Sequence, residues 1–301
     1  MSNKNGLIIA LLITIVFFFI ELIGGFASSS LALVSDAGHM LTDAMALGLA
    51  LMAFLFSSRP ATKERTFGFY RLEIISALFN GSLLILISLF IFYEAFKRFA
   101  HPAEIQTGLM LTIAVIGLFA NAIPAIILYR KPGGNLNIRG AYLHLLADTA
   151  SSIAVIAGGV IIYFTNFYVI DPILSVFIGI LILKGALDLV YQSINILIES
   201  TPSGISIDEV ASAIMNVKGV QSIHDLHVWA ITSGLNAISA HVIIKDVETE
   251  RASALLKEIN GMLKDRYNIS HSTFQTECNS CPEGLICRME PGEKEEHGHH
   301  H

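Results

Sequence analysis

Two histidine–aspartate pairs share one spacing in this chain. His39 and Asp43 enclose Met-Leu-Thr, and His144 and Asp148 enclose Leu-Leu-Ala. Residues four apart on an α-helix project from the same face, about 6 Å apart along the axis. Two such helices that face each other supply two imidazoles and two carboxylates, a tetrahedral set that suits Zn²⁺. The spacing therefore predicts a four-ligand metal site.

The stretches that contain these pairs are apolar. The 301 residues are 53% hydrophobic and only 15% charged, with a mean hydropathy of +0.62, which is typical of a membrane protein. Ionisable groups at membrane depth cost free energy and usually mark an ion path. Six stretches are long enough to cross a bilayer and predict six transmembrane helices, at residues 7–27, 32–56, 72–96, 107–129, 140–164 and 170–198.

Basic residues are concentrated in alternate loops. Lys4 and the 57–71 and 130–139 loops carry eight basic residues, whereas the loop after the third span carries Lys97 and Arg98. This asymmetry predicts that both termini face the cytoplasm. The net charge of −6 does not bear on nucleic acid as a partner. We expect no nucleic acid, because the basic residues are confined to short loops and form no patch interleaved with aromatic residues.

The composition changes after Pro202. Ser206 and Glu209 form a capping box that opens a helix, and Gly219 is expected to stop it. The pattern that follows predicts a small α+β domain of αββαβ order, ferredoxin-like. Its later elements are expected at residues 223–232 (strand), 237–245 (strand), 249–266 (helix) and 270–277 (strand).

Three regions follow from these patterns. Residues 1–200 form the six-helix transmembrane domain, residues 201–281 the cytoplasmic domain, and residues 282–301 a disordered tail rich in charge and histidine. The terminal histidines either collect zinc or are a purification remnant.

Motif, span number and terminal domain together resemble one known family. The run from Ser30 to Asp43, the second pair His144/Asp148 and the αββαβ domain resemble the cation diffusion facilitator family, and most closely its zinc-efflux branch. The resemblance implies a proton-coupled zinc or cadmium exporter that works as a homodimer. It also implies a multi-pass protein of a bacterial inner membrane, with a charge pair between Arg71 and Glu199 that holds the dimer halves together.

Shared ligands explain how protons and metal would exchange. Zinc binds deprotonated imidazole and carboxylate, so metal loading releases protons and protonation releases metal. The spans with His39 and His144 are the second and fifth, and they run antiparallel. Their four ligands can therefore meet near the midplane, where alternating access places a transport site.

A second group of metal-capable residues lies in the terminal domain. All cysteines are expected in the reducing cytoplasm, so zinc binding outranks a disulfide. The resemblance implies a zinc site at the dimer interface that tunes activity. We regard His227 as a surface strand residue. The candidate ligands are His224, His241, His271, Glu277, Cys278 and Cys281.

Other interpretations stay open. Asp36, one turn before His39, either lines the outer exit or ends the helix as an exposed cap. An intramembrane metallohydrolase needs an open position for water and a general base, which four protein ligands would not leave, so we do not expect an enzyme. A membrane zinc sensor without transport would keep the same ligands. Ligand types do not rank Zn²⁺, Cd²⁺ and Co²⁺.

Overall fold

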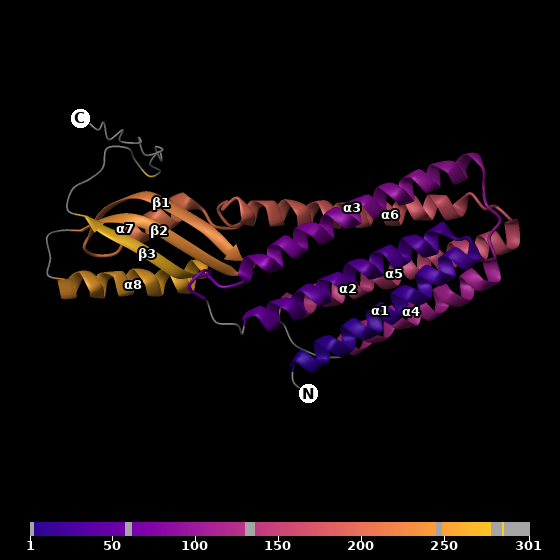
Figure 1. Cartoon of the computed structure of the whole chain (residues 1–301), viewed down its shortest axis with the longest axis horizontal. Coiled ribbons are helices and arrows are strands. Elements are labelled where there is room, and N and C mark those ends of the chain that lie inside the picture. Colours follow the sequence, from indigo (N-terminus) through magenta and orange to yellow (C-terminus); the bar gives the residue numbers. More distant parts are fainter. Residues whose placement is uncertain (1–2, 58–61, 130–135, 245–248, 278–284, 286–301) are drawn as a thin grey trace, which may run out of the picture. The chain divides into compact units, whose positions relative to one another are not determined.

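The structure is a computed structural model that describes residues 3–57, 62–129, 136–244, 249–277 and 285. Within these ranges only the backbone is described at residues 3, 4, 6, 50, 53–57, 120–129, 136–147 and 249. The chain divides into two compact units, Met1–Ser193 and Ile194–His301 (Figure 1).

The first unit is helical. Four of its helices pack in a ring in which α1 contacts α2, α2 contacts α5, α5 contacts α4 and α4 contacts α1; α3 contacts α2 as well (Figure 1). The buried core of the unit draws residues from α2 to α6, such as Leu33, Leu84 and Ile178. The helices are α1 (Asn3–Ser28), α2 (Leu31–Ser57), α3 (Tyr70–Ala100), α4 (Thr107–Tyr129), α5 (Leu136–Thr165) and α6 (Ile170–Leu197).

Small residues let the helices approach closely. A Cβ atom at Gly81 on α3 would lie 2.7 Å from Val190 on α6, and one at Gly179 on α6 would lie 2.8 Å from Phe92 on α3. Glycine at such contacts is characteristic of helix packing in membranes, where van der Waals contact replaces the hydrophobic effect.

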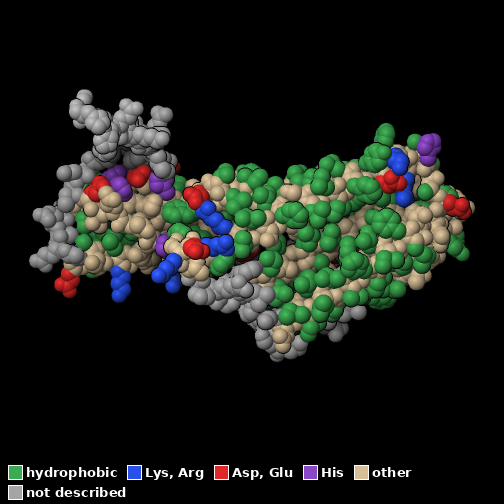
Figure 2. Space-filling view, in the orientation of Figure 1, with side chains coloured by type: hydrophobic (Ala, Val, Ile, Leu, Met, Phe, Trp, Pro, Cys, Tyr) green, Lys and Arg blue, Asp and Glu red, His purple; other side chains and the backbone are tan. Residues whose placement is uncertain are grey.

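The outer surface of the helical unit is apolar. Figure 2 shows hydrophobic side chains over most of its visible face, and large ones such as Phe79, Leu86 and Phe177 are exposed. Among the described residues, four helices are long and apolar enough to cross a membrane: Leu7–Ser28, Tyr70–Ala100, Asp148–Thr165 and Ile170–Leu197. The unit is therefore a helical membrane domain.

The second unit contains a three-stranded sheet of order β1-β2-β3. Strand β1 pairs antiparallel with β2, and β2 pairs parallel with β3. Side chains such as Val210, Ile238 and Ile259 form its core with both helices. In chain order the elements are α7 (Ile207–Met215), β1 (Val220–Thr232), β2 (Leu235–Ile244), α8 (Thr249–Tyr267) and β3 (Ile269–Glu277).

The αββαβ order is the one the sequence predicts, although β1 and β2 begin earlier than expected, at Val220 and Leu235, and the end of the first helix differs as well. Ser206 caps α7 as expected, accepting a hydrogen bond from the Glu209 amide (3.3 Å). However, α7 ends at Met215 rather than at Gly219. Gly219 instead lies in the turn into β1 with a φ of 115°, a conformation that favours glycine.

Candidate metal centres

The membrane pair on α2 lies close to Asp148 on α5. One donor atom from each of His39, Asp43 and Asp148 lies within 4.8 Å of the others. Asp148 is buried, and His39 keeps about a fifth of its side-chain surface exposed. The structure thus brings together three of the four residues predicted as ligands. His144 is on α5, but its side chain lies outside the described residues.

A short hydrogen bond links two of these groups. The Nε2 atom of His39 is 2.6 Å from Oδ1 of Asp148. One of the two must carry a proton, because neither a carboxylate nor an unprotonated ring nitrogen can donate. Both atoms become metal ligands only when that proton has gone. A metal ion bound to both atoms would therefore have to displace this proton.

Asp36 extends the polar region by one turn of α2. It is 2% exposed, and its Oδ1 accepts a hydrogen bond from Ser151 Oγ on α5 (3.1 Å). The alternative that Asp36 is an exposed helix cap is therefore wrong. The helix α2 begins before it, at Leu31, and the side chain of Asp36 is buried inside the helix bundle.

The start of α2 is held by a residue that the sequence analysis did not single out, Asp171 on α6. Its Oδ1 accepts from Ser30 Oγ (2.6 Å) and from the Ala32 amide (3.1 Å), and its Oδ2 accepts from the Leu31 amide (2.7 Å). Ser30 Oγ in turn accepts from the Leu33 amide (3.2 Å). The first three free amides of α2 are thus satisfied, and a carboxylate sits at the positive end of the helix dipole.

Arg98 on α3 completes this cap. Its Nη1 donates to the Ser29 carbonyl and lies 3.5 Å from Asp171 Oδ2, while its Nε donates to Glu94 (3.3 Å). Asp171 is completely buried. One ion pair therefore ties α3 and α6 to the connection between α1 and α2, the helix that carries His39 and Asp43.

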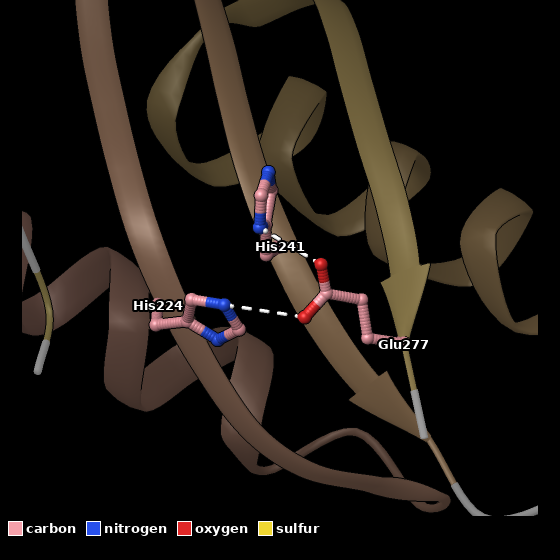
Figure 3. A group of neighbouring side chains, drawn as sticks. All are labelled: His224, His241 and Glu277. Carbon is pink, nitrogen blue, oxygen red and sulfur yellow. Dashed lines mark ion pairs between the residues drawn. The ribbon is translucent and has the colours of Figure 1, made fainter. Parts of the chain in front are cut away.

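A second group of donors lies on the sheet of the other unit. His224 on β1 and His241 on β2 are direct cross-strand partners, and Glu277 ends β3. The carboxylate of Glu277 points toward both rings and pairs with each (Figure 3), with Oε2 3.3 Å from His224 Nε2 and Oε1 3.1 Å from His241 Nδ1. One donor atom from each lies within 4.8 Å of the others.

The donor set fits a metal ion. Two imidazoles and a carboxylate are ordinary zinc ligands. In addition, His224 Nδ1 is buried without a hydrogen-bond partner among the described residues, although buried polar atoms are nearly always paired.

Asp225 supports this group from a bulge in β1. It has a φ of 50°, and the register with β2 shifts between His224 and His227. Its Oδ1 lies 3.1 Å from His227 Nε2, and its Oδ2 lies 3.7 Å from His241 Nε2. A carboxylate beside the outer nitrogen of a candidate ligand is the usual way to orient that ring.

The remaining predicted residues are not in these groups. His271 is exposed on β3, six residues before Glu277, and outside the cluster. Cys278 and Cys281 lie outside the described residues. Arg71 is in the first turn of α3 and Glu199 follows α6; they belong to different units, so their charge pair stays a prediction.

Comparison with known proteins decides the family. A family model described as the cation efflux transmembrane domain matches residues 7–198, and one described as the cation efflux protein cytoplasmic domain matches residues 202–278. The chain belongs to the cation efflux family. The predicted resemblance to cation diffusion facilitators is confirmed.

Relatives align over nearly the whole chain. A cadmium, cobalt and zinc/H(+)-K(+) antiporter of Bacillus velezensis is 43% identical over 99% of this chain and 97% of its own length. The metal cation efflux system protein CzcD of Cupriavidus metallidurans is 41% identical (93% and 88%), and the zinc transporter ZitB of Escherichia coli is 38% identical (100% and 95%).

One solved structure is also similar. The metal-bound C-terminal domain of the CzcD transporter of Cupriavidus metallidurans is 37% identical, covering 24% of this chain and 99% of that structure, with a TM-score of 0.22.

Proposed function

We propose that the chain exports Zn²⁺ from the cytoplasm in exchange for protons, with Cd²⁺ and Co²⁺ as further substrates. Its transport site comprises His39, Asp43, His144 and Asp148. The observation that carries the proposal is the convergence of His39, Asp43 and Asp148 from two helices of a membrane domain. The names of the relatives, which include zinc, cadmium and cobalt antiporters, support the choice of ions.

The position of His144 favours it as the fourth ligand. It precedes Asp148 by four residues on α5, as His39 precedes Asp43 on α2. Four protein ligands close a tetrahedral shell and leave no position for a reactive water, so we propose a transporter and not an enzyme.

Proton coupling follows from the atoms that the metal needs. The proton between His39 Nε2 and Asp148 Oδ1 must leave before both atoms can bind Zn²⁺. Entry of protons from the outer side would then release the metal there. In this proposal the six helices all span the inner membrane, both termini are cytoplasmic, and the site opens alternately to each side.

Reconstituted protein tests the proposal. In proteoliposomes with an imposed pH gradient, we expect zinc to move against the flow of protons, and the pH of the lumen to change only when zinc is added. Protein-free liposomes are the control. Zinc binding without zinc flux would favour the alternative, a membrane zinc sensor. Zinc flux that moves no protons would remove the exchange mechanism.

We further propose that the cytoplasmic unit holds a regulatory or structural zinc ion and joins two copies of the chain. His224, His241 and Glu277 would bind the ion, with Asp225 orienting His241. Cys278 and Cys281 follow Glu277 directly in the sequence and remain candidate ligands. The match to the family's cytoplasmic domain supports a homodimer, in which Arg71 and Glu199 stay the predicted charge pair.

Replacing His241 with alanine should remove this zinc ion. We expect the zinc content of the purified full-length chain to fall by about one ion per chain, because two ligands cannot hold Zn²⁺ tightly. Elemental analysis after dialysis measures the content. His271→Ala is the matched variant, since His271 is a histidine of the same sheet outside the cluster; its zinc content should stay at the wild-type value. The reverse pattern would assign the site to His271.

A further inference from the structure

Glu21 is an acid inside the membrane domain that neither metal group uses. It lies in the last third of α1, is 1% exposed, and neither of its oxygens has a hydrogen-bond partner among the described residues. A buried carboxylate without donors is costly, whereas the neutral carboxylic acid is much less so. An ionisable residue retained at such a position is a functional candidate by default.

The helices around Glu21 leave room for its carboxyl group and provide no countercharge. On α4, Gly117 faces Glu21, and a Cβ atom at that position would overlap Glu21 Oε1. The described side chains of α4, residues 107–119, include no ionisable group. On α2, the charged group that acts on Glu21 is Asp36, through electrostatic repulsion. Both neighbours therefore favour the uncharged acid.

Asp36 connects the charge on Glu21 to the membrane metal group. It interacts electrostatically with His39 and Asp148, one turn away on α2 and across on α5. Its hydrogen bond from Ser151 holds the carboxylate against α5. A divalent cation bound at His39 and Asp148 would offset the charge of Asp36, so that a second negative charge on Glu21 becomes less costly.

We propose that Glu21 is a proton-binding site of the exchange, separate from the metal ligands. It holds a proton when the membrane site has no metal and releases it to water when metal binds. Only the O–H bond of the carboxylic acid breaks, and nothing is oxidised or reduced. This inference rests on the proposed proton-coupled transport and adds one proton to those displaced from the ligands themselves.

Glu21→Gln removes the proton site and keeps the shape of the side chain. When zinc is added to purified full-length protein in weakly buffered detergent, a pH indicator counts the protons released. We expect the variant to release about one proton fewer per chain than the wild type, and the pH dependence of its zinc affinity to lose about one unit of slope. Protons released by zinc binding at the cytoplasmic site are the same in both proteins, so they cancel in the difference between the two counts.

Two glycines of α4 supply a second test. Gly117→Ala should displace the Glu21 carboxyl group and lower the proton count in the same direction, with Glu21 still present. Gly108→Ala adds the same methyl group to α4 where a Cβ meets no atom within 4 Å, so the proton count should not change. This pair separates the effect of Glu21 from the effect of any alanine on α4.

The outcomes separate this inference from the proposed function. A wild-type proton count in Glu21→Gln overturns the role of Glu21 and leaves the exchange mechanism intact. Loss of membrane-site zinc binding in that variant also overturns it, because Glu21 would then support or bind the metal directly. If the wild type itself releases no protons, and transports no zinc when a pH gradient is imposed, then the proposed function is wrong, whatever the role of Glu21.

Discussion

Replacing Asp148 with asparagine should abolish pH-driven zinc transport and leave the chain folded. Asparagine keeps the size of the side chain and still pairs with His39, so the packing of α5 against α2 is preserved. It removes the carboxylate that is our proposed metal ligand and that shares the proton with His39 Nε2 (2.6 Å). Loss of a residue that only hydrogen-bonds to a metal ligand lowers metal affinity by about 10–100-fold. Loss of a direct ligand should lower the affinity by more than the upper end of that range.

Three measurements on the same preparation check this expectation. Zinc flux into proteoliposomes should fall to background, zinc affinity of the membrane site should fall by more than about 100-fold, and thermal unfolding should be unchanged or slightly improved, because a buried charge has been removed. Asp188→Asn is the matched variant. It removes a carboxylate from an exposed position of α6 and should transport normally. Wild-type flux from Asp148→Asn would remove our assignment of the membrane site.

The grouping of the candidate membrane ligands could be predicted because these residues come in local pairs. The spacing of His39 and Asp43 determines which way both side chains point once a helix forms, and the apolar surroundings make that helix certain. The local spacing does not determine that α2 and α5 lie side by side. We infer this tertiary contact from the match between the two pairs, and the contact between the helices confirms it.

The cytoplasmic group could be predicted only in part. His271 and Glu277 lie on the same face of β3, because six residues is an even number, and the sequence pattern does not separate them. They are nevertheless about 20 Å apart along the strand at roughly 3.3 Å per residue. The register between β2 and β3 decides which of them meets His241, and it places Gln275 opposite His241, with Glu277 two residues on.

The supporting residues had no local signal. Asp171 opens α6 beside Pro172, where an acid looks like an ordinary cap of its own helix. Its partners lie about 140 residues earlier. The surroundings of Glu21 and Asp36 likewise become visible only when α4 packs against Glu21 and α5 packs against Asp36. Sequence spacing thus predicts candidate metal ligands, whereas the groups that hold the helices and influence the charge are recognised only from the packing.

Asp171→Ala should destabilise the membrane domain more than any other single change considered for it. The substitution leaves two amides at the start of α2 without acceptors and removes one of the two carboxylates that pair with Arg98, which is mostly buried. Removing one partner of a buried ion pair costs about 3–5 kcal/mol, because the other charge stays behind. We expect a large fall in the thermal unfolding temperature in detergent. Because α2 carries His39 and Asp43, zinc transport should also fall.

Glu94→Gln distinguishes the loss of the Asp171 cap on α2 from the loss of a carboxylate partner of Arg98. Glu94 also pairs with Arg98 but is about a quarter exposed, so its loss should cost at most about 1 kcal/mol. Asp171→Asn keeps one acceptor oxygen without the charge and should fall between the two. If Asp171→Ala and Glu94→Gln lowered the unfolding temperature equally, Arg98 would account for the effect alone, and Asp171 would not be the residue that holds α2. Unequal losses in the expected order would make the start of α2 the point where α3 and α6 control the position of the proposed transport ligands.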